Sequence, residues 1–138
     1  MNRDILVLHQ APKAEEFVAL REAVGWSSPS ISRVRDSIRN SLFHVTIRSG
    51  TQLIAMARVV GDGVMYFYIQ DVVVEPSYMS QGFGSTLMLE IERYLNQHAP
   101  KGATIGLLSV SGKERFYERY GYISRPVNQL GHGMCKFT

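Results

Sequence analysis

A strand, a glycine-rich loop and a helix are predicted in immediate succession within residues 66–96, and this stretch constrains the fold most. Aromatic and β-branched residues dominate 66–74, which favours a largely buried strand. Pro76 cannot donate a hydrogen bond to a sheet, so we expect the strand to end just before it. Apolar residues at helical spacing then predict a helix over 86–96. We expect the rest of the chain to be organised around this strand, loop and helix.

The loop Ser80–Ser85 joins this strand to this helix, and its sequence is Ser-Gln-Gly-Phe-Gly-Ser. The backbone N–H groups at a helix N-terminus point outward, and the helix dipole adds positive potential there. Gly82 and Gly84 would let a phosphate approach the backbone closely. The alternative is an ordinary turn in which glycine only satisfies the backbone geometry. The surrounding strand and helix favour the anion site.

The rest of the chain predicts a single domain, 1–138, of the α/β (α+β) class. The strand expected after the helix follows a strand–helix unit, so it should lie parallel to the central strand through a right-handed crossover. The other expected elements are a strand at 4–9, helices at 12–24 and 29–42, a hairpin of 43–48 with 53–60, a strand at 104–110, a helix at 113–120 and a last strand at 134–138.

Composition narrows the class of protein. With 45% apolar and 20% charged residues the chain is typical of globular proteins, and we expect no membrane partner because no apolar run is long enough to span a bilayer. The net charge of +3 is too small to indicate nucleic acid. Cys135 is the single cysteine, which excludes an internal disulfide and favours the cytoplasm. The histidines show no metal-ligand spacing, so we predict no metal.

Two stretches resemble the signature regions of the GNAT acetyltransferases. One is 72–85 with the helix that follows, and the other is Phe-Tyr-Glu-Arg-Tyr-Gly-Tyr at 116–122. The loop motif of that family is Gln/Arg-x-x-Gly-x-Gly/Ala, and both glycines match while Met79 stands in the first position. The resemblance implies the GNAT fold, a twisted sheet of about six to seven strands, mixed antiparallel and parallel, flanked by about four helices. It also implies acetyl-CoA as co-substrate and an amine as acceptor.

The resemblance places the co-substrate on the central strand and the glycine loop. In this fold the central strand splays from the next one, so pantetheine amides can pair with its free backbone like an added strand. Methionine at position 79 removes a polar donor, so we expect weaker CoA binding, partly compensated by Gln81. The residues assigned to acetyl-CoA are Val72, Val73, Val74, Met79, Ser80, Gln81, Gly82, Phe83, Gly84, Ser85 and Tyr117, with Lys113, Arg115 and Arg119 as candidates for the 3′-phosphate.

Two side chains are candidates for the proton transfers. Tyr117 stands where the family protonates or hydrogen-bonds the CoA sulfur, and a phenol with a reference pKa of about 10 is protonated at neutral pH. Asp71 precedes the pantetheine-binding part of the strand and is the candidate base, with Glu75 a weaker one. The alternatives are a packed aromatic at 117, a structural or bulge-stabilising carboxylate at 71, and a water chain in place of a single base.

The acceptor site carries no sharp motif. We assign Trp26, Tyr68 and Asp71 to it, and Tyr66, Arg33 and His132 are further candidates. The favoured acceptor is a primary amine of a small molecule, such as a polyamine or an arylalkylamine. We also expect a homodimer in which 134–138 pairs across the interface.

Three other functions remain open at this point. The chain could acetylate a protein or peptide amine, or it could be a non-catalytic acyl-CoA-binding module. A dinucleotide-binding oxidoreductase fits poorly, because its third glycine would fall at Leu87.

Overall fold

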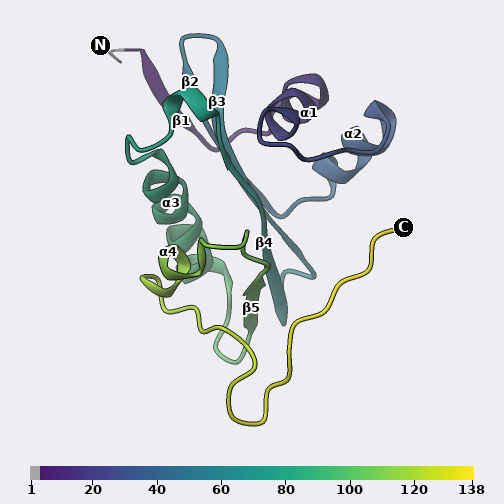
Figure 1. Ribbon diagram of the computed structural model, residues 1–138, viewed down its shortest axis with the longest axis vertical. Helices are drawn as coiled ribbons and strands as arrows, with labels where there is room; N and C mark the ends of the chain where they lie inside the picture. Colours follow the sequence, from purple (N-terminus) through teal and green to yellow (C-terminus); the bar gives the residue numbers. More distant parts are fainter. Residues whose placement is uncertain (1–3) are drawn as a thin grey trace.

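The computed structural model describes residues 4–138, which form a five-stranded sheet with helices on both faces (Figure 1). Its elements, in chain order, are β1 (Ile5–Leu8), α1 (Ala14–Ala23), α2 (Ile31–Arg39), β2 (Phe43–Ser49), β3 (Gln52–Gly61), β4 (Tyr66–Val74), a short 3-10 turn (Pro76–Tyr78), α3 (Phe83–His98), β5 (Thr104–Leu107) and α4 (Glu114–Glu118). None of the described helices is long and apolar enough to cross a membrane.

The sheet has the strand order β1-β2-β3-β4-β5 and confirms the predicted mixed topology. Strands β1 to β4 form an antiparallel meander, and β5 pairs parallel to β4 after the crossover through α3. The strand count is lower than the six to seven expected. Four helices flank the sheet, as predicted.

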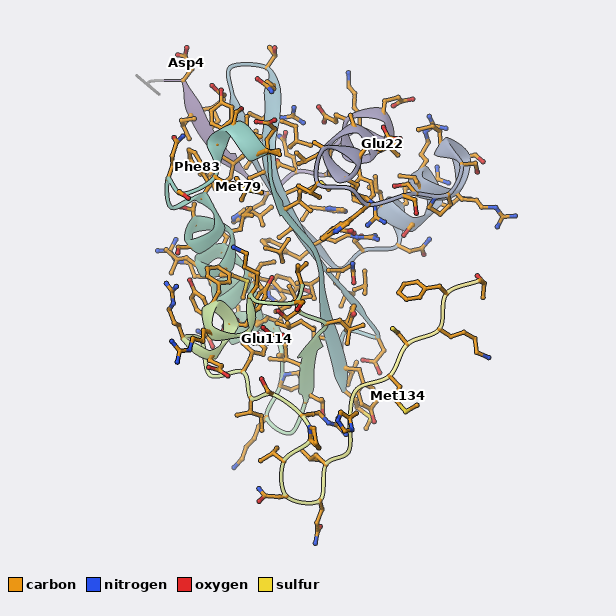
Figure 2. All side chains as sticks on the ribbon, viewed as in Figure 1. Asp4, Glu22, Met79, Phe83, Glu114 and Met134 are labelled. Carbon is orange, nitrogen blue, oxygen red and sulfur yellow. The ribbon has the colours of Figure 1, made fainter. Side chains whose placement is uncertain are left out.

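The predicted last strand at 134–138 is wrong. The segment 131–138 is extended but pairs with no strand in the described part of the chain, and it leads away from the sheet (Figure 1). Met134 and Phe137 are each 91% exposed, and Figure 2 shows Met134 outside both layers of side chains. Within residues 4–138, Met134 and Phe137, two of the apolar residues that suggested a strand, are therefore not buried.

Each face of the sheet carries its own apolar core. Leu87, Met88, Ile91 and Leu95 of α3 recur at helical spacing and are buried against one face. On the other face, the buried residues of α1 and α2 pack on side chains from β3 and β4. Full burial stabilises the folded state by about 1.5–3 kcal/mol for each large apolar side chain. The core residues on this second face are Ala14, Phe17, Leu20, Val34, Ile38, Leu53, Met56 and Val73.

A β-bulge interrupts β4. Two of its residues, Asp71 and Val72, lie opposite the single residue Ala57 of β3, because the register shifts at this point. Asp71 has φ +58°, a left-handed conformation that aspartate tolerates better than most residues. Ile69 packs in the core under α3, whereas Val73, four positions later, packs under α1 and α2. The bulge therefore exchanges the faces of the strand and turns Asp71 toward α1 and α2.

Candidate active site

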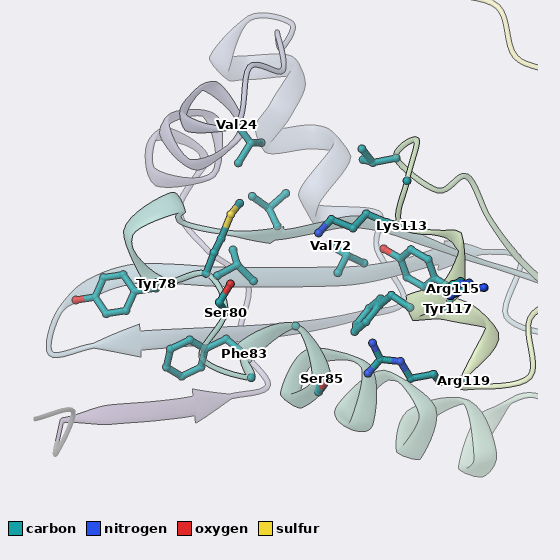
Figure 3. Close-up of a pocket in the computed structure, with 18 of the residues that line it drawn as sticks. Val24, Val72, Tyr78, Ser80, Phe83, Ser85, Lys113, Arg115, Tyr117 and Arg119 are labelled. Atoms are coloured by element: carbon teal, nitrogen blue, oxygen red, sulfur yellow. The ribbon is translucent and has the colours of Figure 1, made fainter.

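A cavity of about 690 Å³ opens between the end of β4, the start of α3 and the segment around α4 (Figure 3). It brings together almost all of the residues assigned to acetyl-CoA. Gln81 belongs to the same loop but does not line the cavity. The assigned residues that do line it are Val72, Val73, Val74, Met79, Ser80, Gly82, Phe83, Gly84, Ser85 and Tyr117.

The wall contributed by β4 has an open backbone edge. The β4–β5 ladder ends at the pair Ile69–Leu107, whereas the β3–β4 ladder continues to the pair Ala55–Val74. Over the last residues of β4, the edge that faces β5 consequently has no strand partner within residues 4–138. An extended ligand that carries amide groups can pair with such an edge.

The wall contributed by the glycine loop is a helix N-terminus. Gly82 adopts φ +87° as the N-cap, and α3 begins at Phe83, three residues before the predicted start. Glycine is a poor helix former, which concealed this first turn in the sequence. The first bond of the helix runs from the Thr86 amide to the Gly82 carbonyl at 3.1 Å, and Gly82, as the N-cap, offers no side chain to cap the turn. The amides of the first turn thus remain available to an anion.

Tyr117 lies on α4 and lines the cavity. In Figure 3 its hydroxyl points toward β4 and Val72. Burial raises the pKa of the Tyr117 phenol above its ordinary value of 10.0, so the hydroxyl is protonated at neutral pH. The ring contacts Phe116 edge-on at a centroid distance of 5.0 Å. Its position and protonation state both suit a proton donor.

Three cations, Lys113, Arg115 and Arg119, also line the cavity. The Arg119 guanidinium lies 5.5 Å from the centroid of the Phe116 ring. No aspartate or glutamate is among the described residues that line this cavity. The cavity therefore favours anionic ligands, as expected for a site that binds phosphate groups.

Asp71 lies behind the cavity wall rather than in it. Its side chain is only 1% exposed and it is not a lining residue. Its Oδ2 accepts a hydrogen bond from Arg58 Nε at 2.9 Å, and its Oδ1 accepts one from Arg21 Nη1. With both oxygens paired to guanidinium groups, the geometry favours the structural alternative over the predicted role as base.

The residues assigned to the acceptor are only partly brought together. Trp26, half-buried in the segment after α1, lines the cavity. Tyr68 does not, although it is also half-buried and burial raises its pKa. Tyr66, Arg33 and His132 are exposed and lie outside the lining. The sequence analysis missed Val24, Tyr78 and Val110, which line the cavity but belong to no recognisable motif.

The Acetyltransferase (GNAT) domain family matches residues 13–137. This chain belongs to the GNAT acetyltransferase family. A crystal structure of a probable acetyltransferase from meticillin-resistant Staphylococcus aureus is similar to this GNAT domain, with a TM-score of 0.88 and 29% identity over 97% of this chain and 99% of that chain.

Curated relatives are similar in sequence but longer. An uncharacterized N-acetyltransferase, ycf52-like, of Prochlorococcus marinus is 34% identical over 80% of this chain and 63% of its own length. A soybean (Glycine max) protein described as histone acetyltransferase TAP1 is 30% identical over 84% of this chain and 54% of its own length. The GNAT domain thus spans about half to two thirds of these two relatives.

The described residues contain no group of three or more His, Cys, Asp or Glu side chains that could hold a metal ion.

Proposed function

We propose that this GNAT domain is an acetyl-CoA-dependent N-acetyltransferase that acetylates a primary amine of a small molecule by direct attack on the thioester. The observation that supports this most is the convergence of three parts in one cavity. These are the uncapped N-terminus of α3, the open edge of β4 and the hydroxyl of Tyr117.

Each part has a separate task in this mechanism. The first-turn amides of α3, together with the cations of the α4 segment, bind the phosphates. The open edge of β4 aligns the pantetheine arm, so that the thioester lies near Tyr117. The neutral amine attacks the thioester carbonyl carbon, the C–N bond forms and the C–S bond breaks. Tyr117 donates its proton to the departing thiolate, and water takes the proton that the amine releases.

The lining of the cavity favours an apolar or aromatic monoamine over a polyamine. Trp26 and Val24 supply apolar surface on the side of the cavity formed by the segment after α1. All the charged side chains among the described lining residues are cations, so the second ammonium of a polyamine would find no carboxylate there. A cationic wall also favours the neutral, reactive form of the attacking amine.

Two other functions, acetylation of a protein amine and non-catalytic acyl-CoA binding, each have one observation in their favour. A protein amine as acceptor is supported by the soybean relative, whose name specifies a histone acetyltransferase. A non-catalytic acyl-CoA module is supported by Met79, which is 49% exposed where the family motif has a glutamine or arginine. The position of Tyr117 favours the enzyme.

Location and assembly are part of the same proposal. An exposed thiol at Cys135 suits a reducing compartment such as the cytoplasm.

The exposed Met134 and Phe137 support a homodimer in which the segment 131–138 packs on a second copy. Light scattering measures the oligomeric state of the wild type and of a variant in which Met134 and Phe137 are both replaced by serine.

The deciding experiment is a thiol-release assay with acetyl-CoA and a panel of amines. The panel contains tryptamine, phenethylamine, spermidine and a short peptide with a free N-terminus. We expect turnover with an arylalkylamine, and we expect Tyr117→Phe to lower kcat by about 10²–10⁴-fold, the usual contribution of a general acid, with unchanged CoA affinity by calorimetry. CoA binding without turnover on any amine would favour the binding module. Absence of CoA binding would contradict the assignment of the cavity.

A further inference from the structure

The carboxylate of Asp71 is the centre of a buried charge network that lies directly behind the cavity. It accepts hydrogen bonds from two guanidinium groups, those of Arg21 on α1 and Arg58 on β3. The Arg58 side chain is only 11% exposed and that of Arg21 only 19%. No buried side-chain nitrogen or oxygen in residues 4–138 lacks a hydrogen-bond partner. The network is fully paired, so its members hold one another in fixed positions.

Arg21 connects Asp71 to the loop that carries Trp26 and so to the cavity wall. Arg21 Nε donates to Ser28 Oγ at 2.8 Å, and Nη2 donates to the Ser27 carbonyl at 2.6 Å. The same guanidinium lies 5.5 Å from the centroid of the Trp26 ring, a cation–π contact. Arg21 therefore ties Asp71 to the loop after α1 and to the indole that lines the cavity.

The second arginine of the network, Arg58, connects Asp71 to α2 rather than to the cavity wall. Arg58 Nη1 donates to the Ser37 carbonyl and to Ser41 Oγ, each at 3.0 Å, and Nη2 donates to Ser37 Oγ at 3.1 Å. These partners lie at the C-terminal end of α2 and just beyond it. Arg58 thus anchors α2 and makes none of the contacts with the Trp26 loop described for Arg21.

The bulge in β4 connects this network to the ligand-binding strand. Asp71 faces the two arginines only because the bulge at Asp71 and Val72 turns it toward α1 and α2. Val72, the next residue, lines the cavity. One carboxylate thereby fixes the strand that would bind pantetheine relative to the loop that would bind the acceptor.

We propose that Asp71 is a positioning residue, and that through Arg21 it holds Trp26 in place as the acceptor wall of the cavity. The inference rests on the proposed function, which takes this cavity as the site of acetyl transfer. Asp71 does not receive the proton of the amine, because both of its oxygens are engaged and it does not face the cavity. The network fixes where the amine lies, and so affects acceptor binding more than the bond-making step.

Trp26 itself provides the test, because it is the single tryptophan of the chain. The variant Arg21→Lys keeps the positive charge but loses the planar fork that donates to several partners and stacks on the indole. We expect red-shifted indole emission and stronger acrylamide quenching in the free protein. With the best amine of the panel, we expect acceptor KM to rise about tenfold at nearly unchanged kcat, because a displaced indole no longer packs against the bound amine.

Arg58→Lys is the matched control. Arg58→Lys also weakens an ion pair with Asp71, but the other contacts that it removes are those with the end of α2. It should therefore lower the melting temperature about as much as Arg21→Lys does, while leaving the Trp26 emission as in the wild type. Equal changes of Trp26 emission in both variants would mean general loosening and would overturn the proposal. Unchanged emission in Arg21→Lys would also overturn it. If Arg21→Lys does not fold, Ser28→Ala removes one partner of Arg21 and gives the same comparison on a smaller scale.

Asp71→Asn separates positioning from proton transfer, since asparagine also tolerates a positive φ. A rise in acceptor KM with altered Trp26 emission supports the positioning role. A collapse of kcat with unchanged KM and emission would identify Asp71 as the base and refute the proposal. Failure of the proposed function gives a third, different result. Calorimetry would then show no acetyl-CoA binding, while Arg21→Lys and Arg58→Lys would still differ in Trp26 emission.

Discussion

The two glycines of the loop before α3, Gly82 and Gly84, differ in a way that predicts opposite effects of alanine on stability. Gly82 has φ +87°, and a Cβ built there meets nothing within 4 Å. The entire cost of Gly82→Ala is therefore conformational, and a left-handed residue with a side chain costs about 1–2 kcal/mol. Gly84 lies in the first turn of α3, and its Cβ would lie 3.5 Å from Phe116 Cζ, an ordinary contact.

From this geometry we expect Gly82→Ala to lower the free energy of unfolding by about 1–2 kcal/mol, and Gly84→Ala to leave it unchanged or raise it by up to about 1 kcal/mol through helix propensity. Urea unfolding followed by Trp26 fluorescence and by circular dichroism measures both values. An equal loss in the two variants would refute the reasoning, because it would mean that contacts rather than backbone conformation require these glycines.

Two further predictions concern charged groups. Arg119→Ala should weaken binding of acetyl-CoA about five- to tenfold in calorimetry, as loss of one charge-assisted contact does, and affect 3′-dephospho-acetyl-CoA much less; an equal loss for both ligands would place Arg119 away from the 3′-phosphate. Glu16 accepts hydrogen bonds from Arg48, which lowers the pKa of Glu16 below 4.5. Because the folded state favours the ionised form of Glu16, the ion pair stabilises the folded state fully above pH 4.5. This stabilisation is lost as the pH falls through the lowered pKa of Glu16. We expect Glu16→Gln to cost about 1–2 kcal/mol at pH 7, measured by urea unfolding, and to cost progressively less as the pH falls below 4.5; a constant difference would contradict the ion pair.

The strand, loop and helix that form the cavity were predictable because each has a local cause. Aromatic and β-branched residues favour β4, and Gly82 is needed for a positive φ that other residues rarely adopt. The position of Tyr117 followed from its motif. Local sequence therefore identified most of the residues that line the cavity, whereas glycine concealed the exact start of α3 and no motif marked Val24, Tyr78 or Val110.

The structural setting of Asp71 was not predictable from local sequence. Regular alternation in β4 would place Asp71 on the same face as Ile69, and the bulge reverses this. A bulge-stabilising carboxylate was one of the alternatives for Asp71, but the sequence did not indicate which groups it would face. Its partners, Arg21 and Arg58, are 50 and 13 residues away in the chain. Charge pairs of this kind arise from packing of distant elements, which a single sequence does not reveal. The same holds for 134–138, where strand-forming residues pair with no strand among residues 4–138.

The β4–β5 ladder ends before the β3–β4 ladder, which leaves the last residues of β4 with one unpaired edge; a ligand that pairs with this edge would couple binding to folding. Unpaired amides at the end of a central strand exchange with solvent, whereas amides bonded to a bound pantetheine chain would be protected. Ligand that occupies only the native state adds RT ln(1 + [L]/Kd) to stability, about 2.7 kcal/mol at one hundred times Kd. The co-substrate would then act as the missing strand segment, and the protein would be most stable while it is loaded for reaction.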